Sequence, residues 1–266
     1  MNKLLTTLLV LAVASVTSVA YAQAAPAAAQ AAPAAAQAAP AASQTAAPAA
    51  PAAQASAAAP AKVAVAAPAA PAGAKTLDAK VAMCIGCHGI KGYQASFPEV
   101  HKVPMISGQS AKYIAAALNA YKAGDRKHPT MRGIADGLSE QDIADISAYY
   151  ESHGKGEGKP VGDKASKEPS AQVAALLQKA ACVSCHGANF SKPIDPTYPK
   201  IAGQHADYMF VALKAYKAEN NPAVGRSNGV MGAIAKQFSN AELKALSGYV
   251  SSLDGELKVV PERKFR

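Results

Sequence analysis

The clearest chemistry in the chain belongs to two short segments, "CIGCH" and "CVSCH", which together use all four cysteines. In a Cys-x-x-Cys-His segment, two thioether bonds fix the edge of a porphyrin and the adjacent histidine reaches the iron. The sequence therefore predicts two covalently bound haem c groups. The attaching cysteines would be Cys84, Cys87, Cys182 and Cys185, and the iron-binding histidines His88 and His186.

Other chemistry at cysteine pairs fits these segments less well. Four cysteines in an exported protein can form two disulfides, and a Cys-x-x-Cys pair can be a redox couple or half of a zinc site. A histidine directly follows the second cysteine in both segments, and no further Cys or His pair supplies the other half of a tetrahedral zinc site. Haem attachment is therefore the favoured interpretation.

The sixth ligand decides whether each iron carries electrons or binds a substrate. The candidates are Met83, Met105, Met131, His101 and His128 in the first half of the chain, and Met209, Met231 and His205 in the second. Only Met131 and Met231 occupy matching positions in the two halves, which favours them as axial ligands over ordinary core residues. A His/Met pair closes both axial positions and raises the reduction potential, which suits electron transfer.

Three further sets of paired residues flank the haem motifs. A histidine ligand normally donates its second ring N–H to a carbonyl, and the candidates are Pro104 and Pro199, each in a P-x-I-x-G-Q segment; each proline could equally shape a turn. Arg126 and Arg226 suit haem propionates, with surface charge as an equal alternative. The tyrosine pairs Tyr113/Tyr208 and Tyr121/Tyr216 indicate core or haem-edge packing.

An internal duplication positions these residues. "GQSAKYIAAALNAYKAG" matches "GQHADYMFVALKAYKAE", and "MRGIADGLSEQDIADISAYY" matches "MGAIAKQFSNAELKALSGYV", in the same order in each half. We expect one domain at residues 75–153, a polar, glycine-rich linker at 154–169, a second domain at 170–254 and a basic tail at 255–266.

Each copy has the pattern of a helical domain. Apolar residues at helical spacing predict helices over 110–123 and 205–218, and further helices that begin after Ser139 and Ser239. Shorter helices at 77–83 and 170–181 run into the cysteine motifs. No stretch alternates apolar and polar residues long enough to predict a sheet, so the expected fold class is all-α.

The first 74 residues differ in composition from the rest. Residues 1–22 combine Lys3, an apolar core and an Ala-x-Ala end, which is typical of a secretory signal, although an uncleaved membrane anchor remains the alternative. Residues 23–74 are almost entirely Ala, Pro and Gln, and regularly spaced prolines break any helix, so we expect a disordered tether. The expected location is the periplasm, with possible membrane association.

Charge divides the folded part unevenly. Residues 75–153 hold nine Lys or Arg against eight Asp or Glu, whereas residues 169–266 hold twelve against seven, so the second half is the basic one. An exported protein rarely meets nucleic acid, so we expect no nucleic-acid partner and favour docking of this half on acidic redox proteins.

The motifs over residues 75–253 resemble those of the diheme class I cytochromes c known as cytochrome c4. The resemblance rests on two Cys-x-x-Cys-His segments, two P-x-I-x-G-Q segments and two methionine segments that precede a Ser-capped helix. It implies two all-α cytochrome domains with haems facing a shared interface. The implied axial ligands are His88, Met131, His186 and Met231.

The resemblance also implies a role. It points to a periplasmic electron carrier without a catalytic site, passing single electrons from a donor such as a quinol-oxidising complex towards a terminal oxidase. The Ala/Pro segment departs from the family pattern and leaves a membrane-tethered subunit of a dehydrogenase as the alternative. A diheme enzyme would need an open or displaceable ligand, which the matched methionines disfavour.

Overall fold

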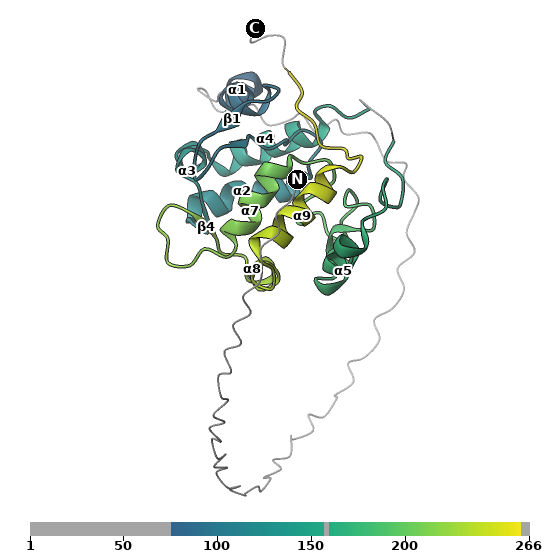
Figure 1. The fold of residues 1–266 in the computed structure, drawn as a ribbon. Helices are drawn as coiled ribbons and strands as arrows, with labels where there is room; N and C mark the ends of the chain where they lie inside the picture. Colours follow the sequence, from purple (N-terminus) through teal and green to yellow (C-terminus); the bar gives the residue numbers. More distant parts are fainter. Residues whose placement is uncertain (1–75, 157–159, 262–266) are drawn as a thin grey trace, which may run out of the picture. The chain divides into compact units, whose positions relative to one another are not determined.

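A computed structural model describes residues 76–156 and 160–261, and this part of the chain is predominantly helical (Figure 1). The expected signal at 1–22 and the expected tether at 23–74 lie outside the described residues, as do parts of the linker and of the basic tail. No helix of the described ranges is long and apolar enough to cross a membrane.

The helices occur in the same order in both halves. The first half contains α1 (Leu77–His88), α2 (Ala111–Ala123), α3 (Pro129–Asp136) and α4 (Glu140–Ser152). The second half contains α5 (Ala171–Lys179), α6 (Cys182–His186), α7 (Ala206–Ala215), α8 (Gly229–Lys236) and α9 (Asn240–Ser251). The duplication seen in the sequence is therefore a duplication of the fold.

Equivalent helices pack on one another in each half. Helix α2 packs on α3 and α4, and α1 on α4; in the second half α7 packs on α8 and α9, and α5 on α9. Apolar residues spaced three or four apart bury one face of α4 and α9, which explains why both are central. These core residues are Ile143, Ile146 and Tyr150 in α4, and Leu243, Leu246 and Val250 in α9.

The two central helices begin at matching capping boxes. The Ser139 hydroxyl accepts the N–H of Asp142 at 3.1 Å, while the Asp142 carboxylate accepts the N–H of Ser139 at 3.0 Å. Ser239 and Glu242 make the same reciprocal pair in α9. Each box satisfies amide groups that a helix start leaves without partners, so it fixes the first residue of each helix.

Helices α3 and α8 were absent from the sequence prediction. Helices α3 and α8 are only eight residues long; α3 begins with Pro129, and each helix contains at least one glycine. A window this short gives little periodicity, and glycine lowers helix propensity, so the sequence pattern is weak. These two helices carry Met131 and Met231 as their third residues.

The two cysteine motifs differ in backbone conformation. Helix α1 runs without a break through the first motif to His88, longer than the predicted 77–83. In the second half α5 ends at Lys179, and Ala181 has a left-handed φ of 47° before α6 begins at Cys182. The observed helix is therefore shorter than the predicted one over 170–181, because Ala181 turns the chain instead of continuing the helix.

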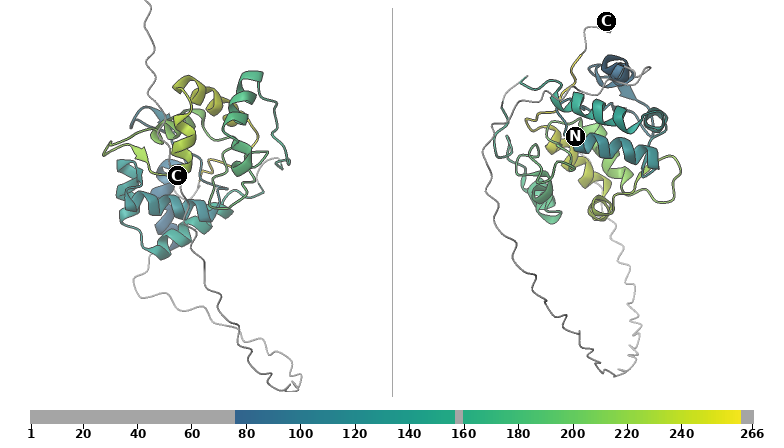
Figure 2. Two further views of the ribbon diagram at one scale, coloured as in Figure 1. Left: turned by 90° about the horizontal axis from the view of Figure 1, so that it is seen from below. Right: turned by 180° about the vertical axis from the view of Figure 1, so that it is seen from behind.

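Two short strand pairs occur in the described residues, one local and one between the two halves. Strand β1 (Gln94–Ala95) pairs with β2 (His101–Lys102) inside the first half. Strand β3 (Arg126–Lys127) pairs antiparallel with β4 (Gly225–Arg226) across the two halves. With two residues each, these strands are too short to produce an alternating pattern, and the all-α assignment stands. Figure 2 shows β4 beside the first-half helices.

The described part of the C-terminal tail crosses back to the first half. Leu257 is buried, and the Lys258 N–H donates to the Ser107 carbonyl at 3.1 Å. Gly108 lies against the C-terminal segment and has a left-handed φ of 84°. A Cβ atom at this position would come within 2.5 Å of the Glu256 carbonyl oxygen. Residues 255–261 are thus part of the packed structure.

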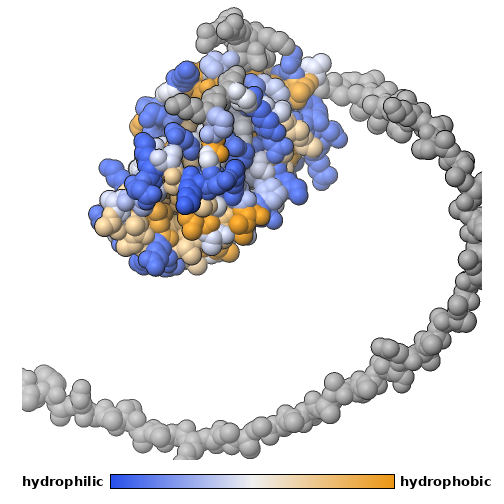
Figure 3. Space-filling model, turned by 90° about the vertical axis from the view of Figure 1, so that its right-hand side faces the viewer, coloured by the Kyte–Doolittle hydropathy of each residue, from blue (hydrophilic) through white to orange (hydrophobic). Residues whose placement is uncertain are grey.

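In the face seen in Figure 3, hydrophobic residues gather towards the lower edge below a largely hydrophilic band.

Candidate functional site

The first cysteine motif lies at the end of α1, where the helix meets the loop that contains Pro104. His88 Nδ1 lies 2.7 Å from the Pro104 carbonyl oxygen, so the ring donates this N–H and leaves Nε2 free. Burial lowers the pKa of His88, which keeps the imidazole neutral as iron ligation requires. Cys84 packs against the core around Tyr150, and burial raises the pKa of its thiol to about 11.

The second motif repeats this arrangement. His186 Nδ1 lies 3.0 Å from the Pro199 carbonyl oxygen, and burial lowers the pKa of this histidine as well. Cys182 packs against the second core, where burial raises the pKa of its thiol. No disulfide joins any of the four cysteines, so all four side chains are available for thioether bonds. Each motif therefore presents two thiols and one oriented imidazole nitrogen.

The two matched methionines lie in the first turn of capped helices. The Met131 N–H faces His128 Nδ1 at 3.4 Å, and the Met231 N–H donates to Asn228 Oδ1 at 2.9 Å. Both methionine side chains are half-buried, and Met131 packs against the first core. The cap residues were missed at the sequence level, although a residue able to cap, three positions before each methionine, was a usable signal.

The other sixth-ligand candidates have different surroundings. Met83 is exposed, whereas Met209 is buried in a separate hydrophobic cluster of the second half. His101 is buried, with Nδ1 2.8 Å from the Glu99 carbonyl oxygen. His128 acts as the cap of α3, and its ring also stacks edge-on against Phe97. The structure therefore gives no second matched pair among these residues.

Arg126 and Arg226 come together where β3 pairs with β4. Arg126 donates to the hydroxyls of Tyr113 at 3.2 Å and Tyr208 at 2.8 Å, and Arg226 donates to Tyr208 at 3.2 Å. The guanidinium of Arg226 also lies 5.3 Å from the ring centre of Tyr216. Both arginines are half-buried among tyrosines from both halves, so neither is an ordinary surface charge.

This cluster holds more positive charge than its neighbours neutralise. Burial raises the pKa of Tyr208, but Arg126 and Arg226 outweigh burial and lower it to about 8. The buried Arg126 Nε has no hydrogen-bond partner, and neither arginine forms an ion pair within the described residues. A buried guanidinium is costly without an anion, so the cluster fits the carboxylates that haem carries.

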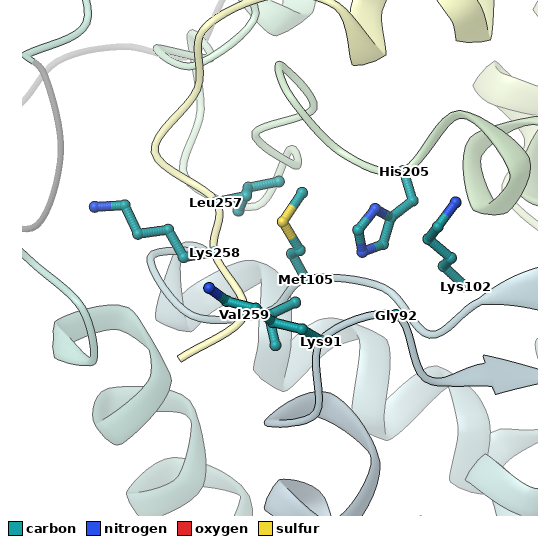
Figure 4. Close-up of a pocket in the computed structure, with 8 residues that line it drawn as sticks. All are labelled: Lys91, Gly92, Lys102, Met105, His205, Leu257, Lys258 and Val259. Atoms are coloured by element: carbon teal, nitrogen blue, oxygen red, sulfur yellow. The ribbon is translucent and has the colours of Figure 1, made fainter. Parts of the chain in front are cut away.

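A pocket of about 550 Å³ opens between the two halves and the C-terminal segment (Figure 4). Met105 and His205 point towards its interior, and the apolar Leu257 and Val259 close one side. Lys91, Lys102 and Lys258 contribute to its lining as well. None of the proposed iron-binding residues lines this pocket.

Comparison with known proteins places the duplicated fold in a family. The family model for cytochrome c matches twice, at residues 70–154 and 170–254. Cytochrome c4 of Stutzerimonas stutzeri is 31% identical over 191 residues, covering 68% of this chain and 89% of that protein. Cytochrome c4 of Azotobacter vinelandii is 30% identical over 190 residues, covering 65% and 86%.

A third relative has a different name. The thiosulfate dehydrogenase electron acceptor of Thiomonas intermedia is 27% identical over 181 residues, covering 65% of this chain and 79% of that protein. The expected fold class, two tandem cytochrome c domains, is confirmed by the two family matches.

The fold and the paired motifs define a diheme c-type cytochrome with a role in electron transfer. The chain belongs to the cytochrome c family and is a cytochrome c4-like member of it. It carries two covalently bound haem c groups with iron, and redox proteins are its partners.

Proposed function

We propose that this protein is a periplasmic electron carrier in which His88 and Met131 ligate one iron and His186 and Met231 the other. Bound haem c supplies a one-electron ferric/ferrous couple. The observation that supports the proposal is the matched arrangement, in which each half contains one oriented histidine and one methionine in the first turn of a capped helix.

The residues around each motif have distinct roles in this proposal. The carbonyls of Pro104 and Pro199 fix the ring orientation of the two histidines, which supports a stable ligand geometry. The cysteines anchor the porphyrin covalently, and the Arg126/Arg226 cluster offers guanidinium groups to propionates. The proposed domains are residues 75–153 and 170–254, joined by the linker at 154–169.

Replacing each methionine in turn tests the ligand assignment. M131A and M231A should each remove about half of the near-infrared sulfur-to-iron band of the ferric protein and let one reduced haem per chain bind carbon monoxide. The reduction potential of that haem should fall, because thioether ligation favours ferrous iron. M83A is the matched control, since Met83 is exposed and next to the first motif. An unchanged spectrum in M131A or M231A would contradict the assignment.

The physiological redox partner has two candidates. Transfer towards a terminal oxidase is what the resemblance to cytochrome c4 implies, and the basic second half offers a surface for docking on an acidic partner. The name of the Thiomonas intermedia relative supports the alternative of a cytochrome that accepts electrons from a dehydrogenase. In this alternative the N-terminal segment would hold the cytochrome near the membrane.

Two rates separate these candidates. The reduced protein is mixed with membranes that contain a terminal oxidase, and the oxidised protein with thiosulfate and a thiosulfate dehydrogenase. Fast oxidation by the membranes without reduction in the second mixture supports the oxidase role, and the reverse supports the dehydrogenase role. N-terminal sequencing of the mature protein from the soluble fraction would show whether residues 1–22 are removed.

A further inference from the structure

Two buried glutamines connect the halves of the molecule. Gln109, two residues before α2, donates through Nε2 to the Lys200 carbonyl at 3.0 Å and accepts the Lys200 N–H on Oε1 at 3.0 Å. Gln204, two residues before α7, makes the same two bonds with Met105, at 2.9 Å and 3.0 Å. The residues are 4% and 5% exposed, so these bonds are shielded from water.

Each side-chain amide makes three hydrogen bonds that require one orientation. Gln109 Oε1 also accepts the Ser110 N–H, and Gln204 Oε1 the His205 N–H, both at 3.0 Å. Since each oxygen receives two N–H groups and each nitrogen faces a carbonyl, a flipped amide would lose all three bonds. The amides are therefore held in a defined direction.

The residue that Gln204 contacts shares a peptide group with the carbonyl that orients His88. The Met105 N–H and the Pro104 carbonyl belong to one planar, conjugated unit. The N–H donates to Gln204 and the carbonyl accepts from His88 Nδ1 at 2.7 Å. A continuous path therefore runs from a histidine of the first half, through one peptide group, to a glutamine of the second half.

An equivalent path runs from His186 of the second half to Gln109 of the first half. The Lys200 N–H and the Pro199 carbonyl form one peptide group, which donates to Gln109 and accepts from His186 Nδ1 at 3.0 Å. Each half thus holds, with its own glutamine, the peptide group that orients the haem histidine of the other half.

We propose that Gln109 and Gln204 are positioning residues that tune the haem of the opposite half. An acceptor on a peptide N–H polarises the unit and makes its carbonyl a stronger acceptor, because hydrogen bonds in a chain reinforce one another. A stronger bond to the histidine N–H makes the ring a more electron-rich ligand. The inference rests on the proposed function, since it requires His88 and His186 to be iron ligands.

Replacing one glutamine tests whether its amide tunes the haem of the opposite half. Q204L should raise the reduction potential of the haem attached at Cys84 and Cys87, because the Pro104 carbonyl loses polarisation. The ring N–H signal of His88 should shift in the NMR spectrum of the reduced protein and exchange faster with solvent, while the His186 signal stays in place. Q109L should give the reverse assignment.

A second substitution changes the sign of the effect. Q204E keeps an acceptor for the Met105 N–H, adds negative charge and removes the donor to the Met105 carbonyl. The potential of the first haem should therefore fall, whereas Q204L raises it. A general loosening of the interface would shift both variants in one direction, and Q204E still provides the measurement if Q204L does not fold.

Gln237 supplies the matched control. It is exposed at the C-terminal end of α8, as the residue that follows Lys236, and its amide donates to the Ala233 carbonyl of that helix, so Q237L should leave both potentials and both histidine signals unchanged. The inference is overturned if Q204L shifts the second haem or both haems equally, or leaves both unchanged. A wild-type protein without two low-spin, histidine-ligated haems would instead reject the proposed function.

Discussion

At the scale of single residues, the most unusual feature is a pair of half-buried guanidiniums among tyrosines. Arg126 and Arg226 share the Tyr208 hydroxyl, and no carboxylate of the described residues pairs with them. Two neighbouring positive charges stabilise anions and destabilise the ferric state of a nearby haem iron. The two arginines should therefore raise the reduction potential of at least one haem.

Replacing one guanidinium by an apolar chain of similar length should make the haems easier to oxidise. We expect R126M and R226M to lower at least one reduction potential, because a nearby positive charge destabilises the ferric state. R126K should keep most of the charge but lose the double contact with Tyr113 and Tyr208. Optical redox titrations of the three variants provide the measurement. Potentials unchanged in R126M and R226M would place the cluster too far from the haems to matter.

The site could be predicted from sequence to the extent that its residues repeat. Cys-x-x-Cys-His is a local pattern, and the position shared by Met131 and Met231 singled them out among the methionines. Gln109 and Gln204 also repeat, but their partners are backbone groups of the other half. Such contacts depend on how the domains pack, so the residue pattern could not assign their role.

At the scale of elements, equivalent helices are held by different interactions in the two halves. Lys80 on α1 pairs with Asp142 at 2.9 Å and Asp145 at 2.5 Å on α4, and its side chain is only 9% exposed. In the second half, Lys179 on α5 instead donates to the Gln237 carbonyl at 2.9 Å. The first half therefore depends on carboxylates where the second does not.

This difference predicts that acid weakens the contact between α1 and α4 of the first half more than the Lys179 contact of the second half. Hydrogen bonds from Ser139 and Lys80 lower the pKa of Asp142, and Lys80 lowers the pKa of Asp145. The unfolded chain takes up these protons near pH 4 and the folded chain only at lower pH, so folding loses this stabilisation as pH falls below about 4. K80M should reduce the free energy of unfolding at pH 7 and flatten its dependence on pH below 4. A pH dependence equal to that of the wild type would contradict the role of this ion pair.

Helix α8 depends on its cap, because the helix is short and contains two glycines. N228A should lower the free energy of unfolding by about 1 kcal/mol, since the Met231 N–H would lose its acceptor. N228D should restore most of the loss, because aspartate is an equally good cap. Chemical denaturation of both variants measures the difference. Equal stability of N228A and the wild type would show that the cap contributes nothing.

The elements themselves were predictable where they were long. The helices α2, α4, α7 and α9 have clear apolar periodicity, and serines mark the starts of α4 and α9. Helices α3 and α8 are short, and the β3–β4 pair exists only because the domains meet. Local sequence patterns record propensity and periodicity, whereas these features arise from tertiary packing.

At the scale of the whole molecule, the C-terminal segment of the chain packs against the first half. The segment after α9 lies on the first half, with Leu257 buried and Lys258 bonded to Ser107, so residues that follow the second domain stabilise the first. A tail predicted from its charge alone is, over its described residues, a packed connection between the two halves.

The packing of this segment can be measured with one substitution. L257A should lower the free energy of unfolding by about 2 to 3 kcal/mol, as expected for truncating a buried leucine. Leu77, which is 43% exposed at the start of α1, provides the control, and L77A should change stability by less than about 0.5 kcal/mol. Equal effects of the two substitutions would show that the C-terminal segment does not pack against the protein in solution.

The β3–β4 pair places a residue opposite its own counterpart, since Arg126 faces Arg226. The glutamine contacts obey the same rule, because each glutamine bonds the residue equivalent to the partner of the other. A contact in which one patch meets a copy of itself is the isologous geometry of a twofold homodimer. The interface is therefore one that two separate copies of a single domain could form, and duplication within one chain makes it permanent while freeing the two haem environments to diverge.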